Sequence, residues 1–204
     1  MGRNDDMRIA KVALAFAAAV VCAPAAFACD GKAEVEAAFV KQQKQPWRTE
    51  ILTKAPDGAD QLQRFDFQPP DKMYRKASAR GESVETIGIG QSAWGNQGDG
   101  AGWEVLEARQ ATLVTAHIEE AFAPPRVMAD FNCLGDVTFE GKAYRAYQTT
   151  PEKIESGDML ARTIYVDSDT GLPAYNIVGA PDGSGDPMVR STYSYPTDIR
   201  IEKP

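Results

Sequence analysis

The chain has 204 residues, a length that suits one domain with a single hydrophobic core. It carries 22 Lys and Arg against 29 Asp and Glu, so its formal net charge is −7. Such an acidic surface repels phosphate backbones and anionic membrane surfaces. The composition therefore predicts no nucleic-acid partner and disfavours adhesion to a membrane.

The first 28 residues have the order of a secretory signal peptide. Arg8 and Lys11 precede an apolar run at 12–22, and Ala26-Phe27-Ala28 supplies the small residues that signal peptidase reads. This run is shorter than the roughly 20 apolar residues that a membrane-spanning helix needs. We therefore expect cleavage before Cys29 and a periplasmic domain at 29–204 without stable membrane insertion.

Two cysteines remain after such cleavage, Cys29 and Cys133. An even pair in an oxidising compartment favours a disulfide, which here would close a loop of about 100 residues and contribute on the order of 4 kcal/mol. The minor alternative is a lipoprotein anchored through Cys29, although Ala26 stands where lipoprotein signals usually carry Leu. A third alternative is two free thiols.

The first half of the domain reads as a helix followed by strands. Apolar residues spaced by three and four, among them Val35, Ala38 and Phe39, predict an amphipathic helix at 31–45 that Pro46 ends. After it the apolar period becomes two, with turn residues such as Arg80-Gly81 between segments. The predicted strands are 47–55, 62–68, 72–79, 83–89, 91–95 and 102–106.

The second half repeats this order. Leu113, Val114, His117, Ile118 and Phe122 share one side of a predicted helix at 109–122. The strands predicted after it are 127–133, 137–140, 142–149, 163–167, 172–178 and 188–195. Turns this regular predict a mostly β (α+β) fold: a single large curved antiparallel sheet, an incomplete barrel, with the two helices packed on its concave face.

Motifs for catalysis or metal binding are weak. His117 is the single histidine, and its place beside Leu113 and Val114 favours a partly buried structural role. Asp167-Ser168-Asp169-Thr170-Gly171 resembles the start of a calcium loop, but the twelfth position is Val178 instead of a glutamate, so a hairpin turn is favoured. We therefore predict no enzyme, no cofactor and no metal, with an unrecognised hydrolase as the weaker alternative.

Several segments resemble one protein family. They are Pro46-Trp47, 64–74, Ala93-Trp94, Gly102-Trp103-Glu104, the hairpin 165–174 and the aromatic strand 191–195. Together they are similar to the periplasmic LolA-like superfamily, the half-barrels related to lipoprotein-localisation factors, of which this chain would be a divergent member. The resemblance implies a half-barrel in which the helices act as a lid over acyl chains.

The expected function is therefore that of a periplasmic carrier or binding protein for a lipid, a lipoprotein acyl chain or another elongated apolar molecule. An envelope protein is a possible second partner, and the alternative function is a non-catalytic interaction module with a filled core. The oligomeric state stays open. The candidate ligand-lining residues, which could equally form a closed core, are Trp47, Phe65, Phe67, Met73, Ile87, Ile89, Trp94, Trp103, Phe122, Tyr144, Ile164, Val166 and Tyr193.

Overall fold

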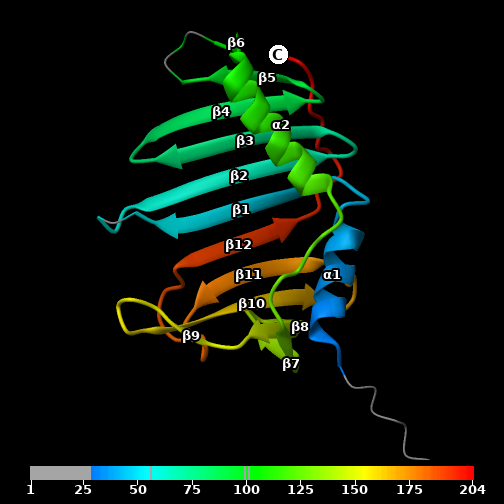
Figure 1. The fold of residues 1–204 in the computed structure, drawn as a ribbon, viewed down its shortest axis with the longest axis vertical. Coiled ribbons are helices and arrows are strands. Elements are labelled where there is room, and N and C mark those ends of the chain that lie inside the picture. Colours follow the sequence, from blue (N-terminus) through cyan, green and yellow to red (C-terminus); the bar gives the residue numbers. More distant parts are fainter. Residues whose placement is uncertain (1–28, 56, 99, 101) are drawn as a thin grey trace, which may run out of the picture.

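The computed structural model describes residues 29–55, 57–98, 100 and 102–204, and the predicted signal peptide at 1–28 lies outside them. Two helices and one 12-stranded antiparallel sheet make up this part (Figure 1). No helix in it is long and apolar enough to cross a membrane. The elements are α1 (Gly31–Gln42), β1 (Trp47–Lys54), β2 (Asp60–Gln68), β3 (Lys72–Ala79), β4 (Glu82–Ile89), β5 (Ser92–Asn96), β6 (Glu104–Val105), α2 (Ala108–Phe122), β7 (Phe131–Phe139), β8 (Lys142–Thr149), β9 (Glu152–Lys153), β10 (Met159–Asp167), β11 (Pro173–Gly179) and β12 (Val189–Ser194).

The sheet consists of two meanders joined in the middle. Its strand order is β6-β5-β4-β3-β2-β1-β12-β11-β10-β8-β7, with β9 paired to β10 off this path. The join is the antiparallel pair β1–β12, in which Arg48 lies opposite Ser194. Because β6 and β7 do not pair with each other, the sheet stays open, as expected for an incomplete barrel.

In two tight hairpins, the backbone conformation of the turn residues explains the turn. Arg80 and Gly81 join β3 to β4, and both have positive φ values, 53° and 84°. Glu140 and Gly141 join β7 to β8 in the same way, at 49° and 80°. Two successive residues with positive φ form the turn whose twist matches that of a hairpin, and glycine adopts this geometry without a steric penalty.

The prediction of separate strands at 127–133 and 137–140 was wrong. Residues 131–139 form the single strand β7, and residues 127–130 are not in a strand. The pairing with β8 shifts between Cys133 and Gly135, and Gly135 has a φ of 79°. A bulge of this kind absorbs an extra residue without ending the strand, so the glycine bends β7 where the sequence suggested a break.

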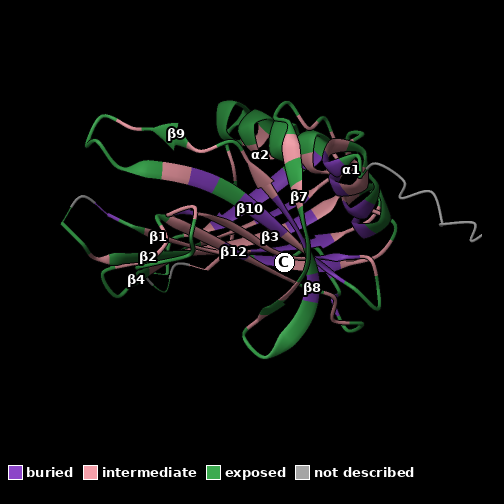
Figure 2. Ribbon diagram, turned by 90° about the horizontal axis from the view of Figure 1, so that it is seen from below, coloured by how far each residue is buried: buried purple, intermediate pink, exposed green. Residues whose placement is uncertain are grey.

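Both helices lie on one face of the sheet, called here the inner face (Figure 2). Below α2, Ile118 packs against Trp47, Phe65, Phe67 and Met73. Below α1, Val35 and Ala38 pack against Tyr147, Ile164 and Val166. The helices therefore cover the sheet as two separate apolar contacts, one in each meander.

The opposite, outer face is partly covered by the C-terminal segment. Ile199 and Ile201 pack there against Ile87 and Trp94. The segment is held by hydrogen bonds on both sides of the Ile201 peptide: its N–H donates to Gln68 Oε1 at 2.8 Å, and Lys72 Nζ donates to its carbonyl at 3.0 Å. This end of the sheet is therefore apolar on both faces.

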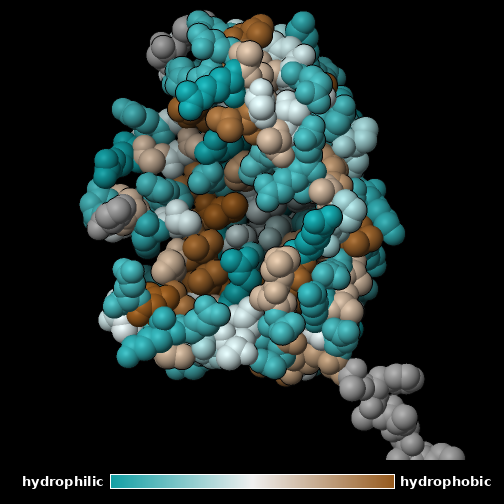
Figure 3. All heavy atoms as spheres, viewed as in Figure 1, coloured by the Kyte–Doolittle hydropathy of each residue, from teal (hydrophilic) through white to brown (hydrophobic). Residues whose placement is uncertain are grey.

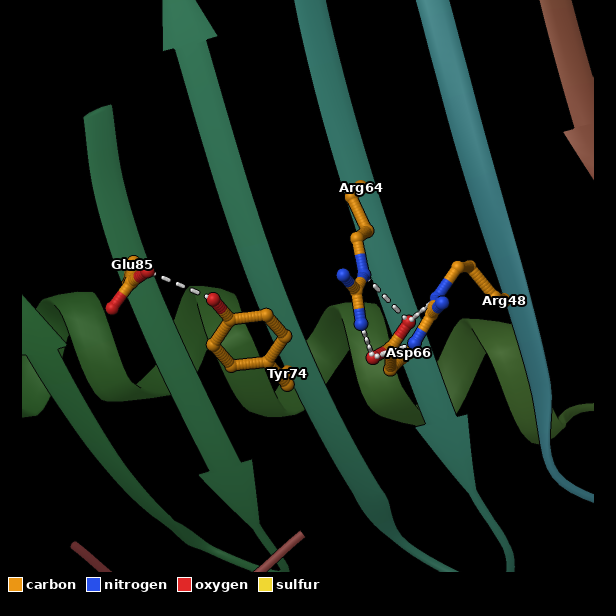
Figure 4. Close-up of polar contacts among 5 residues, drawn as sticks. All are labelled: Arg48, Arg64, Asp66, Tyr74 and Glu85. Carbon is orange, nitrogen blue, oxygen red and sulfur yellow. Dashed lines mark hydrogen bonds and ion pairs between the residues drawn. The ribbon is translucent and has the colours of Figure 1, made fainter. Parts of the chain in front are cut away.

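Elsewhere the outer face of β1–β4 carries a polar network centred on Asp66 (Figure 4). Arg48 donates to both carboxylate oxygens at 2.6 and 3.0 Å, and Arg64 does the same at 3.1 and 2.6 Å. Tyr74 donates to Glu85 at 2.9 Å, and burial together with this bond raises the pKa of Tyr74 to about 12. The bonds of Asp66 join β1 to β2, and the bond of Tyr74 joins β3 to β4.

We predict that the Asp66 network makes stability depend on pH. Burial alone would raise the pKa of Asp66, but the bonds from Arg48 and Arg64 outweigh it and hold the pKa below its usual value. The stabilisation is therefore complete above about pH 4, the pKa in the unfolded chain, and is lost as the pH falls through the lower folded value. Asp66→Asn should lower the free energy of unfolding by about 1.5–3 kcal/mol at pH 7.

Urea denaturation at pH 7 and below pH 3 gives the free energy of unfolding of both proteins. The difference in this free energy between wild type and Asp66→Asn should shrink at the lower pH. Asp60→Asn on the same strand is the matched control, because its ion pair with Lys54 is exposed to solvent and should contribute little to stability. A difference for Asp66→Asn that stays constant down to the lowest pH would contradict the argument.

The predicted disulfide is present. Cys29 and Cys133 are bonded across 104 residues, with Cα atoms 6.3 Å apart, a normal separation for a disulfide. Next to it, the side chain of Asp30 caps α1 by accepting from the Ala33 N–H at 3.0 Å. The bond thus ties the start of α1 to the edge strand β7.

The double variant Cys29→Ser, Cys133→Ser should unfold more easily by about 2–5 kcal/mol, because the unfolded chain regains the freedom that a loop of this length had lost. Chemical denaturation gives the free energy, and reductant should weaken the wild type by a similar amount while leaving the double variant unchanged. Equal stability of oxidised wild type and double variant would refute this.

Candidate functional site

The helices leave part of the inner face uncovered, and apolar side chains gather along the middle of this face (Figure 3). One hollow of about 300 Å³ opens between α2 and strands β2–β4, and we call it the α2 hollow. A second, of about 590 Å³, lies where the ends of α1 and α2 approach the sheet. A third, of about 390 Å³, lies beside α1. Volumes of this size are typical of small-molecule sites.

The α2 hollow has a floor from the sheet and a roof from the helix. Its lining is Gln63, Phe65, Met73, Arg75, Thr86, Leu113, Val114 and His117. Leu113 is 68% exposed at the rim, a poor position for a leucine unless something apolar covers it. Next to this hollow, another of about 320 Å³ shares Gln63 and Arg75 and extends along β3 and β4.

Gly88 allows α2, which forms the roof of the hollow, to lie close to the sheet. A Cβ atom placed on Gly88 would lie 2.6 Å from Ile118 Cδ1 and 2.7 Å from Val114 Cγ1. The helix therefore approaches the sheet over a position where any side chain would push it away. The hollow opens on the side of this contact where Phe65 and Arg75 lie.

His117 lies flat on Phe65, with ring centroids 5.1 Å apart and an interplanar angle of 11°. Burial of this ring face lowers the pKa of His117, and the positive charge of Arg75 lowers it further, against the opposing effect of Glu120. His117 was expected to be a partly buried structural residue. Only the ring face that stacks on Phe65 is covered, and the residue as a whole is exposed. His117 is also one of the lining residues of the α2 hollow.

Arg75 is the charged group in this hollow. Its Nη2 donates to Gln63 Oε1 at 2.9 Å, and its guanidinium carbon lies 5.7 Å from the Phe65 ring centroid. Its Nε is buried and has no hydrogen-bond partner among the described residues. Asn176 Oδ1, in the wall of the hollow beside α1, is buried and unpartnered in the same sense. Both unsatisfied atoms therefore belong to hollows of the inner face.

The candidate lining residues fall on two faces of the sheet. On the inner face, the α2 hollow contains Phe65 and Met73, the larger hollow contains Trp47, Phe67 and Tyr193, and the hollow beside α1 contains Ile164. Phe122 and Val166 pack in the core between helices and sheet.

The remaining candidates do not join them. Ile87 and Ile89 flank Gly88 on β4 and therefore point to the outer face, where Trp94 and Trp103 pack with them against the C-terminal segment. Tyr144 is also on the outer face, in an aromatic group with Tyr165 and Tyr175. The expectation of one common inner face for all these residues was wrong, because both faces of this sheet have apolar covers.

The sequence analysis overlooked Gln63, Arg75 and Thr86. Their signal was the strand period, since Arg75 is two residues after Met73 and so shares its face. An isolated arginine between strand residues is ordinarily solvent-exposed, and this concealed it. The exposed leucine of α2 had no local signal, because only the crossing of the helix over β4 places it at a rim.

The chain has an open, curved antiparallel sheet with two helices over hollows on one face, as the resemblance to the LolA-like half-barrels led us to expect, and solved structures share this fold. LprF from Mycobacterium bovis has a TM-score of 0.52 at 10% identity, over 85% of this chain and 96% of that one. The MucB structure of Pseudomonas aeruginosa in complex with MucA gives 0.45 at 12%, over 83% of this chain and 59% of that one. A LolA superfamily protein from Nitrosomonas europaea gives 0.30 at 15%, over 86% and 95%.

The chain thus spans less than two thirds of the length of MucB. No protein-family model matches the sequence, and no curated protein matches it significantly. At these identities the likeness concerns the fold, and the function has to be argued from the site.

We predict that α2 rests on Gly88 as a close contact. Gly88→Ala should lower the free energy of unfolding by about 1–3 kcal/mol through overpacking, although a strand interior by itself favours Ala over Gly. Ile118→Val should cost about 0.5–1.5 kcal/mol alone. In the double variant the shorter side chain makes room for the new methyl group, so the combined cost should be less than the sum. Strictly additive costs would show that the two residues do not meet.

Proposed function

We propose that the protein binds an elongated apolar molecule, a lipid or an acyl chain, in the hollows between the sheet and its two helices, without catalysis. The observation that carries this is the α2 hollow itself. It is floored by Phe65 and Met73 and roofed by Leu113 and Val114, and Leu113 remains largely exposed at its rim. An acyl chain that covered these groups would gain about 0.8 kcal/mol for each buried methylene.

The alternative of a filled core and a pure protein-docking role is less favoured. A filled core would leave the inner face closed by the helices, whereas several hollows of about 300–590 Å³ remain there. A buried donor and a buried acceptor without partners also line them, and closed cores rarely keep such atoms.

The proposed setting is the periplasm, reached through cleavage of residues 1–28. The oxidised pair of Cys29 and Cys133 supports this setting, because disulfides persist in oxidising compartments. It also favours an unlipidated Cys29, since a thiol bonded to Cys133 cannot carry an acyl anchor. Residues 29–204 would then act as one binding domain.

The test is to express the chain with its own leader, purify it without detergent, and weigh it by native and then denaturing mass spectrometry. Wild type should carry a non-covalent mass in the lipid range that disappears on denaturation. Thr86→Trp fills the α2 hollow and should lose most of this mass. Lys76→Trp is the matched control, because its side chain pairs with Glu85 on the outer face and the substitution should leave the mass in place.

Circular dichroism establishes that both variants fold. Equal retention by the two variants would move the binding site out of the α2 hollow. A wild-type protein that carries no mass and takes up none of the envelope lipids offered to it would refute the proposed function and favour the docking module.

A further inference from the structure

Arg75 differs from the arginines of the outer face in its pairing. Arg48 and Arg64 share Asp66, and Arg190 is paired with Glu140 at 2.7 Å. Arg75 makes no ion pair with any described residue, and its Nε–H is buried without a partner. Arg75 is partly buried, and an unpaired cation beside apolar side chains and an unmade hydrogen bond are each unfavourable, so an acceptor that entered the hollow would stabilise this side chain.

The donor of the Arg75 guanidinium that has no partner has a defined position. Gln63 already accepts from Nη2, which leaves the Nε–H as a donor on the same planar group. Thr86 lies directly opposite Arg75 in the β3–β4 register and also lines the hollow. Guanidinium donors of this geometry match the oxygens of a carboxylate or phosphate, and the Thr86 hydroxyl and the Gln63 amide can supply further donors.

Half of the lining around Arg75 is apolar. Phe65 lies under the guanidinium, and Met73, Leu113 and Val114 form the other apolar part of the wall, whereas Gln63, Thr86 and His117 are polar. A hollow with one cation, further polar groups and an apolar wall fits an amphiphile, whose head binds the polar part and whose chain contacts the apolar part. A wholly neutral chain would leave the Arg75 donor unsatisfied.

We propose that the ligand of the α2 hollow has an acidic head, a carboxylate or a phosphate, and that Arg75 binds it. This inference rests on the proposed function and adds the chemical class of the ligand. The overall charge of the chain is −7, so an anion is repelled by most of the surface. A site that binds an acidic head in this chain therefore requires a cation that is not already paired within the protein.

The test uses calorimetric titration of the full chain, freed of co-purified mass, with three probes, the two acids below their micelle concentrations and the alcohol below its solubility limit. Palmitate carries a carboxylate, lysophosphatidylglycerol carries a phosphate, and hexadecanol has the palmitate chain without a charge. Wild type should bind at least one of the acids about tenfold or more tightly than the alcohol. The acid that binds more tightly identifies the source of the head.

In Arg75→Met this preference should vanish: the preferred acid should bind on the order of 10- to 100-fold more weakly, while hexadecanol changes less than about threefold. Arg75→Lys keeps the charge and should keep part of the preference, which tests the inference even if the methionine variant folds poorly. Arg64→Met is the matched control, since it removes the same charge from the other face of the neighbouring strand and leaves Asp66 paired with Arg48.

His117 offers an independent readout as the single histidine of the chain. Its charged neighbours are Arg75 and Glu120. Nuclear magnetic resonance titration of untagged protein should show its pKa below 6.5 without ligand, rising when a bound acid offsets the charge of Arg75. Hexadecanol should not produce this rise, and Arg75→Met should abolish the response to acid.

Equal affinity of wild type for the acids and the alcohol would overturn the acidic head and leave the lipid-binding proposal standing. Failure of wild type to bind any of the three probes would count against both. An unchanged acid preference in Arg75→Met would also overturn the inference, because the head would then be held elsewhere.

Discussion

The structure depends on one mismatch of area between its sheet and its helices. Strands lie about 4.8 Å apart, so the path from β6 to β7 is roughly 48 Å across. At 1.5 Å per residue, α1 extends about 18 Å and α2 about 22 Å. Two such helices cannot cover the inner face: α2 covers the part around Trp47, Phe65 and Phe67, and α1 covers the part around Tyr147 and Ile164. The hollows are what remains.

Charged side chains are paired differently on the two faces of the sheet. On the outer face, Asp66 and Glu140 have arginine partners, and these pairs stabilise the sheet from within the protein. On the inner face, Arg75 keeps an unpaired donor next to Phe65. A chain that pairs its outer charges across several strands could in principle pair this one too. The contrast supports a stabilising role for the outer pairs and agrees with the proposed binding of a ligand in the inner hollow.

Much of this fold could be predicted from the sequence, because helix periods, strand alternation and turn residues are local. The helices, the Arg80-Gly81 and Glu140-Gly141 hairpins and the single curved sheet were predictable in this way. The Gly135 bulge was not, since a glycine in a strand indicates either a bend or an end.

The site was less predictable for a longer-range reason. Ile87 and Ile89 look like inner-face residues until the C-terminal segment, which has no regular secondary structure, is found packed over them. Arg75 reads as an ordinary surface cation until α2 is placed above its strand. Both assignments depend on which distant segment covers which face, and no local pattern encodes that.

The pairing of β1 with β12 has a consequence for how the chain is made. The central ladder joins Arg48 to Ser194, almost the two ends of the domain, so it can form only after all the strands between them have been made. Contacts this distant in sequence close slowly, because the entropy of a long loop is lost before any contact compensates for it. A chain that is still being synthesised therefore lacks the strand that joins the two meanders. Until β12 has been made, each meander has an unpaired edge strand at the middle of the future sheet.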